Sequence, residues 1–181
     1  MQNEESLVQR AKQHDQEAFA QLYEEYFDKI YRYVALKIGD RTEAEDMTQQ
    51  VFVKALRSIS SFRWKGKPFS AWLFRIAHNL IVDYLRKRSR RAAVPLAEPM
   101  PAGDGDPQQA AERRLDIDRL ALATRQLTEA QREVISLRFA GELPIAQVAR
   151  VMGKKEGAVK ALQHSAIAAL RRSLRTQDND E

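Results

Sequence analysis

The chain of 181 residues contains no cysteine and few glycines and prolines, 7 and 6 respectively. The absence of cysteine excludes disulfides and thiolate metal sites, and it is compatible with a reducing compartment. Scarce glycine and proline are typical of a mostly helical chain, because both residues weaken helix interiors. No apolar run reaches the roughly 20 residues of a membrane-spanning helix, and the first ten residues do not resemble a signal peptide. We therefore expect a cytoplasmic protein without membrane insertion.

Charge is distributed unevenly, although the whole chain carries only +5 at pH 7. Residues 1–53 carry 6 basic and 11 acidic side chains, whereas residues 54–91 carry 11 basic side chains and one acid. A second basic stretch covers residues 119–175. Two basic blocks indicate two contacts with a polyanion, although basic side chains can also simply solvate a helix. Because each block coincides with a helical pattern, we favour two nucleic-acid sites.

Apolar periodicity predicts an all-helical chain. Residues 16–38 have apolar side chains at helical spacing, with Asp15 as the expected N-cap and Gly39 as the expected stop. A second helix is expected to begin at Thr42, which with Glu45 matches the capping-box pattern. Its apolar stripe is expected to consist of Ala44, Met47, Val51, Phe52, Ala55, Leu56 and Ile59.

A third helix is expected to follow Pro68, because proline favours the first turn of a helix, and to end in the basic run of residues 86–91. Residues 92–107 contain most of the prolines and lose the helical period, which is typical of an extended linker. A further helix is expected after the linker, as far as about Gln126. The expected organisation is a domain of residues 1–92, a linker of residues 93–106, a domain of residues 107–176 and a tail of residues 177–181.

The second domain contains another clear helix signal. Thr128 and Gln131 match the capping-box pattern, and the helix that they open is expected to end at Gly141. Its buried side chains are expected to be Val134, Ile135, Leu137 and Phe139.

Residues 144–172 have the pattern of a helix-turn-helix: a short helix, a turn at Gly153 and a longer helix. In this motif the first helix braces the second, whose N-terminal half can enter the major groove and read the base pairs. Glycine turns also join helices in ordinary bundles, so the pattern alone leaves DNA binding undecided. The candidate DNA contacts are Lys155, Glu156, Lys160, Gln163 and His164 at or near the outward face, with Arg171 directed toward phosphates.

Aromatic and basic side chains are interleaved in residues 61–91, beginning in the loop before the third helix. Such a mixture suits single-stranded nucleic acid, because bases stack on rings while cations contact the backbone. Trp72 is expected to belong to the core, and the alternative for Trp64 is a structural cap over that core. The candidate contacts with an unpaired strand are Phe62, Arg63, Trp64, Lys65, Arg75, Asn79 and Arg86.

No set of catalytic residues emerges from the sequence. His14, His78 and His164 lie in separate segments, and no zinc-protease, phosphate-loop or nucleophile-elbow motif is present. We therefore expect no enzyme activity, no metal site and no cofactor. The second helix also has a surface that does not face its core, formed by Asp46, Gln49, Gln50, Val53 and Lys54. By itself, such a surface indicates only contact with solvent.

Taken together, four stretches resemble the sigma-70 family, and specifically its smallest branch, the extracytoplasmic function (ECF) sigma factors. The order and the spacing agree, and the resemblance covers roughly residues 5–175. The four stretches are DMTQQVF at 46–52, FSAWLFRIAHNL at 69–80, LTEAQREV at 127–134, and VMG followed by EGAVK within 151–160.

The resemblance implies two helical domains that bind core RNA polymerase and promoter DNA. Asp46, Gln49, Gln50 and Val53 would contact the clamp of the largest subunit. The first domain would capture the melted minus-ten strand, whereas the second would dock on the flap of the second-largest subunit and read the minus-thirty-five duplex. Many relatives are inhibited by an anti-sigma factor, which is therefore a possible partner here.

Several positions depart from the pattern of the family, among them Pro144 and Ala146 on the supporting helix and Leu162, Gln163 and Ser165 in a stretch that is usually richer in arginine. An acid is common where this chain has Gln50, so one charged polymerase contact is expected to be missing. The usual Ser or Thr N-cap of the recognition helix is replaced by Lys155, a change that costs about 1 kcal/mol of helix stability.

Two other classes of protein stay open at this point. A helix-turn-helix regulator would bind duplex DNA through residues 128–172 and use residues 1–91 for sensing or dimerisation, with tight binding to a twofold operator. A helical enzyme acting on nucleic acid would need an acidic cluster for metal ions, and no such cluster is evident in the pattern.

Overall fold

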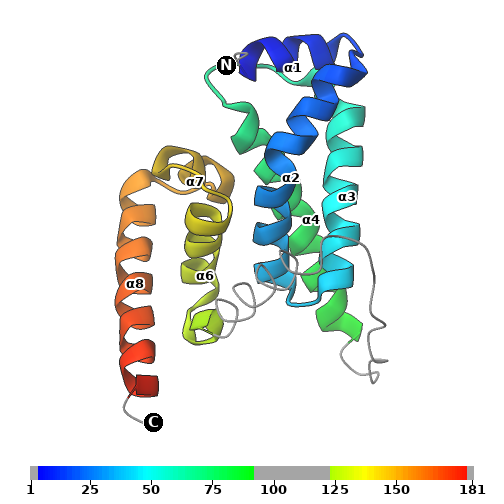
Figure 1. Ribbon diagram of the computed structural model, residues 1–181. Helices are drawn as coiled ribbons and strands as arrows, with labels where there is room; N and C mark the ends of the chain where they lie inside the picture. The colour runs from blue at the N-terminus through cyan, green and yellow to red at the C-terminus, as the bar shows by residue number, and fades with distance from the viewer. Residues whose placement is uncertain (1–3, 92–122, 179–181) are drawn as a thin grey trace.

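The computed structural model describes residues 4–91 and 123–178, and every regular element in these ranges is helical (Figure 1). This confirms the predicted all-α fold. None of the described helices is both long enough and apolar enough to cross a membrane. The α-helices are α1 Glu4–Lys12, α2 Gln16–Ile38, α3 Arg41–Ser58, α4 Phe69–Arg91, α6 Glu129–Ile135, α7 Ile145–Met152 and α8 Glu156–Asp178. The shorter helical turns are η1 Ile59–Ser61, η2 Thr124–Gln126 and η3 Ser136–Ala140.

Helix ends in the first domain follow local sequence signals, with one correction. The Asp15 side chain accepts hydrogen bonds from the backbone of Glu17 and Ala18, and Gly39 ends α2 in the left-handed conformation with φ 78°. The predicted capping box of the second helix is wrong. Asp40 is the N-cap of α3, and its carboxylate accepts from the backbone N–H of Glu43.

Helix α1 was not predicted from the sequence. It has only nine residues, too few for the apolar period to be distinguished from chance. Tertiary contacts stabilise it instead: Val8 and Ala11 are buried, and the Tyr26 hydroxyl of α2 donates a hydrogen bond to Glu4. Burial, followed by the hydrogen bond to this carboxylate, raises the pKa of Tyr26.

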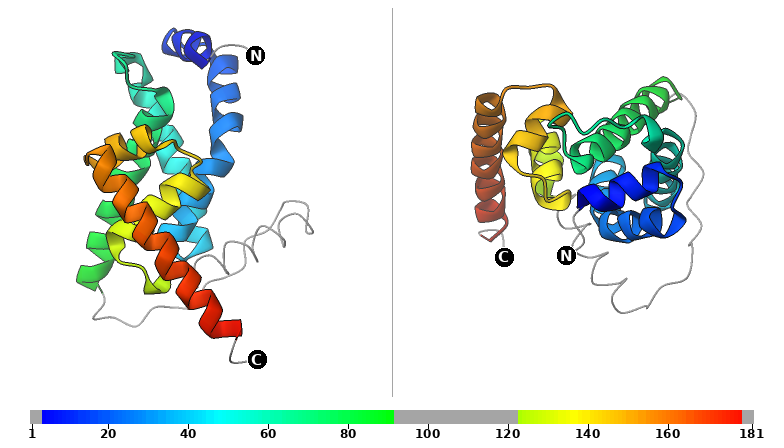
Figure 2. Two further views of the ribbon diagram at one scale, coloured as in Figure 1. Left: turned by 90° about the vertical axis from the view of Figure 1, so that its left-hand side faces the viewer. Right: turned by 90° about the horizontal axis from the view of Figure 1, so that it is seen from above.

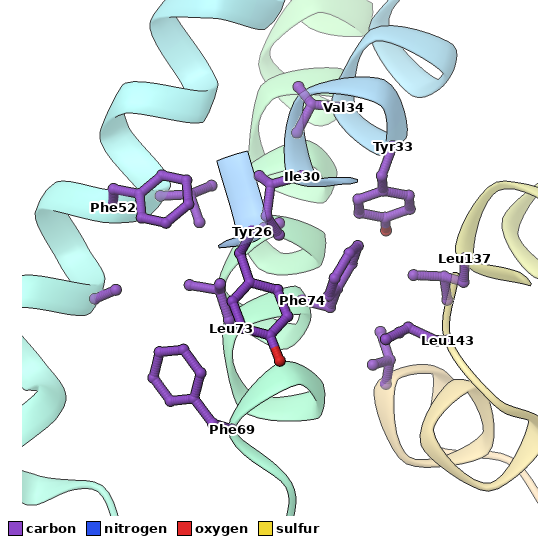
Figure 3. Packing of buried hydrophobic residues seen from close by; sticks show 14 of the residues in the cluster. Tyr26, Ile30, Tyr33, Val34, Phe52, Phe69, Leu73, Phe74, Leu137 and Leu143 are labelled. Atoms are coloured by element: carbon purple, nitrogen blue, oxygen red, sulfur yellow. The ribbon is translucent and has the colours of Figure 1, made fainter. Parts of the chain in front are cut away.

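Helices α2, α3 and α4 pack around the core of the first domain (Figure 3). Large side chains from all three helices meet there. Tyr26 packs edge-on against Phe69, with 5.7 Å between ring centroids, and Tyr33 lies 5.5 Å from Phe74. Leu56 is a correction to the predicted stripe of α3, because its side chain is 55 % exposed.

The second domain contains α6, α7 and α8. Both halves of the predicted capping box at Thr128 and Gln131 are present, and Gly153 makes the turn between α7 and α8 with φ 64°. The prediction that Phe139 is buried is wrong, because its side chain is 52 % exposed. The reason is η3, a π-helical turn, whose extra residue changes the direction of the side chains that follow.

The two domains pack against each other in the described residues (Figures 1 and 2). Helix α7 and the turn η3 contact α4 and α2, whereas α8 lies on the outer side of the second domain. Leu137 and Leu143 extend the core of the first domain toward Phe74 (Figure 3). Gly141 permits this close approach, because a Cβ atom there would lie 2.7 Å from the Phe74 ring.

The predicted linker of residues 93–106 lies outside the described residues, and so does most of the helix expected to follow it. The predicted tail begins at residue 177, and the part beyond residue 178 is likewise outside them. The domain boundaries at these positions stay predictions.

Candidate nucleic-acid interface

An aromatic cluster supports the loop before α4. Phe62 is only 4 % exposed, and its ring centroid lies 5.7 Å from that of Trp64, 5.1 Å from that of Trp72 and 5.9 Å from that of Phe69. Phe62 is therefore a core residue in this arrangement, which corrects its prediction as a base contact. Its ring supports Trp64, which remains partly exposed.

The loop itself presents cations to solvent. Arg63 and Lys65 are exposed on either side of Trp64. The backbone N–H of Lys67 donates to the carbonyl of Trp64, and Gly66 takes the left-handed conformation that closes this turn, with φ 65°. The result is a partly exposed indole between two basic side chains, an arrangement that suits an unpaired strand.

Helix α4 continues this surface with three of the predicted residues, which differ in exposure and in their contacts. Asn79 is exposed, one turn beyond Arg75. The guanidinium of Arg75 is engaged by the second domain, because Nη1 donates to the carbonyls of Arg150 and Val151 at 2.9 and 3.1 Å. Arg86 is exposed, with the Asp83 carboxylate 4.0 Å away. At that distance and exposure, the pair contributes little.

Helices α7 and α8 form the predicted helix-turn-helix. Val148, Val151 and Val159 are buried between the helices. Lys155 occupies the N-cap position, where its backbone carbonyl accepts from Val159 N–H at 3.1 Å. Its side chain cannot accept a hydrogen bond, as the sequence implied. The exposed outward side chains are Lys155, Glu156, Lys160, His164 and Arg171.

Gln163 differs from the other predicted residues of α8. It is half-buried, and its side-chain oxygen accepts a hydrogen bond from Arg138 Nε at 2.8 Å. Arg138 in turn donates to the Leu143 carbonyl at 2.7 Å. Gln163 therefore connects α8 to the turn η3 before α7, and it lies at the edge of the outward face.

The predicted polymerase-binding residues share one exposed side of α3. Asp46, Gln49, Gln50 and Val53 are all exposed, and Gln49 Nε2 donates to the Tyr23 hydroxyl at 3.3 Å. Val53 and Leu56 add apolar area to this side, with exposures of 46 % and 55 %. Exposed apolar side chains among polar ones favour a docking surface over one that only contacts solvent.

Glu133 of α6 is the main residue that sequence reasoning missed. Its side chain is 6 % exposed and accepts from the Tyr33 hydroxyl at 2.5 Å, while its other oxygen lies 2.7 Å from Lys37 Nζ. His78 Nδ1 lies 2.9 Å away. Burial alone would raise the pKa of Glu133, but the contacts with His78, Lys37 and Tyr33 lower it to about 2. The one local signal was its position directly before Val134 and Ile135, which were predicted to be buried.

Comparison with known proteins agrees with this arrangement. The model of Sigma-70 region 2 matches residues 22–91, and that of Sigma-70, region 4 matches residues 123–172. The ECF RNA polymerase sigma factor SigW of Bacillus subtilis is 33 % identical over 178 residues, which cover 93 % of this chain and 95 % of SigW. BldN of Streptomyces coelicolor, also an ECF RNA polymerase sigma factor, is 39 % identical over 170 residues. That match covers 93 % of this chain and 64 % of BldN, so this chain spans less than two thirds of that relative.

Two solved structures are also similar. CnrH, in complex with the cytosolic domain of CnrY, gives a TM-score of 0.72 at 29 % identity, with 94 % of this chain and 96 % of that chain covered. The sigma factor RpoE from Bartonella quintana, in complex with the anti-sigma factor NepR, gives a TM-score of 0.67 at 25 % identity, with 87 % and 96 % covered.

These matches and the two packed helical domains define a protein with sigma regions 2 and 4. The chain belongs to the ECF sigma factors of the sigma-70 family, which direct RNA polymerase to promoters for transcription initiation. The family is non-enzymatic, and membership sets aside both the operator-binding regulator and the nucleic-acid enzyme.

Proposed function

We propose that this sigma factor binds core polymerase through one side of α3 and contacts the promoter at two separate surfaces. The observation that supports this most directly is the exposed set Asp46, Gln49, Gln50 and Val53 on a helix within the region 2 match. These residues contact the clamp of the largest subunit. Because polymerase is the partner, the protein acts in the cytoplasm.

The first promoter surface is the single-strand surface, which we define as Arg63, Trp64, Lys65, Asn79 and Arg86. Trp64 offers a partly exposed ring, Asn79 offers an amide, and the basic side chains contact the phosphates. Duplex DNA hides the faces of its bases, so this combination is useful on a melted minus-ten strand.

The second promoter surface lies on α8. The exposed side chains of Lys155, Glu156, Lys160 and His164 occupy the N-terminal half of α8, the part that enters a major groove in this motif. Arg171 lies farther along the helix and contacts phosphates. The same domain docks on the flap of the second-largest subunit, which positions α8 over the minus-thirty-five element.

An anti-sigma partner is a further proposal, which the complex of RpoE with the anti-sigma factor NepR supports. To test it, this chain is purified from its source cells together with any protein bound to it. The recovered partner should then inhibit run-off transcription by this sigma factor with core enzyme.

The polymerase contact is tested by replacing Asp46 and Gln49 together with arginine. We expect the double variant to lose at least tenfold in affinity for core enzyme while its helical circular dichroism and thermal midpoint stay unchanged, because both side chains are exposed. Glu24, exposed on α2, provides a matched control when it is replaced by arginine. Pull-down with core enzyme and run-off transcription give the readout. If the double variant binds core enzyme as the wild type does, this side of α3 is not the contact.

The duplex contact is tested with Lys160→Ala. Loss of one phosphate contact should lower the slope of log affinity against log salt by about one for holoenzyme on a promoter that needs the upstream element. Lys12→Ala in α1 is the control, because it removes the same charge from the other domain. An unchanged slope together with unchanged promoter choice would assign Lys160 to the solvated surface.

A further inference from the structure

A single acid interrupts a basic stretch of the second domain. Between Leu143 and Gln177 the sequence has seven lysine and arginine side chains, and Glu156 is the only acidic one. Glu156 lies in the first turn of α8, and its side chain is exposed. Because phosphates repel a carboxylate, an acid at this position weakens the sequence-independent attraction of α8 to DNA. Glu156 therefore does not serve binding to the DNA backbone.

The carboxylate of Glu156 is available to a ligand. Within residues 4–91 and 123–178, no ion pair or hydrogen bond engages its side chain. Two polar side chains farther along α8 are engaged by contrast. Gln163 Oε1 accepts from Arg138 Nε at 2.8 Å, and the Ser165 hydroxyl accepts from Gln131 Nε2 at 2.9 Å. The free acceptor of this region is thus the one in the first turn of the helix.

The neighbours of Glu156 leave room for the helix to approach DNA closely. Gly157 and Ala158 are exposed, and a Cβ atom on Gly157 would meet no other atom within 4 Å. Residues 157–162 contain no side chain with a hydrogen-bond acceptor. Lys160 is the polar exception among them, and it can only donate. In the first two turns of α8, Glu156 is therefore the side chain that can accept a hydrogen bond from a base.

The chemistry of the major groove narrows the choice of base. An ionised carboxylate accepts hydrogen bonds and donates none. The donors in the major groove are cytosine N4 and adenine N6. Adenine N6 lies between two acceptors, its own N7 and thymine O4, and both repel a carboxylate. Cytosine N4 has an acceptor on one side only, guanine O6, so a carboxylate favours cytosine.

We infer that Glu156 determines the sequence preference of α8 by accepting a hydrogen bond from cytosine N4 in the minus-thirty-five element. This inference rests on the proposed function, in which the N-terminal half of α8 enters the major groove. Lys160 lies four residues farther on the same side of the helix, at about 6 Å along its axis. Its phosphate contact holds the carboxylate over one base pair, so the preference for cytosine is confined to one position.

A purely structural role for Glu156 predicts a different result. An acid in the first turn of a helix interacts favourably with the helix N-terminus. Loss of that interaction would destabilise α8 and weaken the use of every promoter to the same extent. Loss of a base contact changes the preference at one base pair and leaves the other positions as they were.

Transcription from a template library distinguishes these roles. Holoenzyme made from core polymerase and this protein transcribes templates in which each base pair of the upstream element takes all four identities, and sequencing counts the RNA products. Wild type should use cytosine at one position about five- to 150-fold better than the other bases, as expected for one mismatched base pair. Glu156→Ala should abolish the preference at that position alone. Glu156→Gln should move it from cytosine to adenine, because an amide pairs with adenine N6 and N7.

Glu17→Ala is the matched control. Glu17 is also an exposed acid in the first turn of a long helix, but it lies on α2 in the first domain. The control should keep the base preference of the wild type at every position. Helical circular dichroism and the thermal midpoint of each variant verify that it is folded.

The outcomes separate the inference from the proposed function. The inference is overturned by an unchanged preference in both Glu156 variants, by an equal loss at every position, or by loss of a preference for a base other than cytosine. If wild-type holoenzyme transcribes without any base preference in the upstream element, the proposed role of α8 fails, and the inference fails with it.

Discussion

Replacing Trp64 with alanine should slow promoter opening by holoenzyme about five- to 150-fold, because loss of a base–aromatic contact typically costs about 1–3 kcal/mol. Asn79→Ala should have an effect of similar size if its amide reads a base edge. Binding to closed duplex promoter should change much less, since base faces are hidden there. Permanganate reactivity of unpaired thymines measures opening directly.

The controls for this experiment use the exposed positions of the structure. Glu24→Ala removes a polar side chain from α2, away from the single-strand surface, and should open promoters normally. A pre-melted template should not fully rescue Trp64→Ala, because the lost contact is with the strand itself. Trp64 also packs on Phe62, so thermal unfolding is measured alongside. Normal opening by both variants would make the loop a structural cap.

The second large effect is loss of stability in acid, centred on Glu133. The ordinary pKa of this carboxyl is 4.5, and in the packed structure its pKa is lowered to about 2. The Glu133 carboxylate therefore binds a proton more tightly in the unfolded chain than in the packed structure. Its contribution to the free energy of unfolding is complete above about pH 4.5. It is lost as the pH falls from about 4.5 toward 2. A shift of this size corresponds to about 3 kcal/mol.

Urea unfolding at a series of pH values measures this effect. Wild type should lose stability between about pH 4.5 and 2, and Lys37→Met with Glu133→Gln should lose about 3 kcal/mol less over the same range. The double variant keeps the remaining carboxylates, so the difference between the two curves isolates the contribution of the buried Glu133–Lys37 pair. Parallel curves for the two proteins would show that Glu133 does not couple pH to stability.

The sequence by itself determined most of the helices, because their signals are local. The Asp15 cap, the Gly39 stop and the capping box at Thr128 depend on residues within one turn, and the structure confirms each of them. The helix-turn-helix was also predicted from local pattern, with Gly153 at its turn. The resemblance to sigma factors came from four short stretches, and the matches to regions 2 and 4 confirm it.

Only the tertiary structure decided which side chains are exposed and free to contact DNA or a partner. Phe62 belongs to an aromatic cluster, Phe139 is turned outward by a π-helical turn, and Gln163 is bonded to Arg138. The residue type indicates whether a side chain prefers burial or contact with water. It does not indicate which other side chain it contacts. For Gln163 that neighbour lies 25 residues away in the chain, so no local pattern contains it.

The contact between the domains shows this difference most clearly. Glu133 and Lys37 are 96 residues apart by number, and each alone reads as an ordinary charged residue of a helix. Local sequence determines that each helix forms and which stripe is apolar. Whether a charge on that helix ends in water or in a buried pair depends on how the two domains pack, and only the tertiary structure decides that.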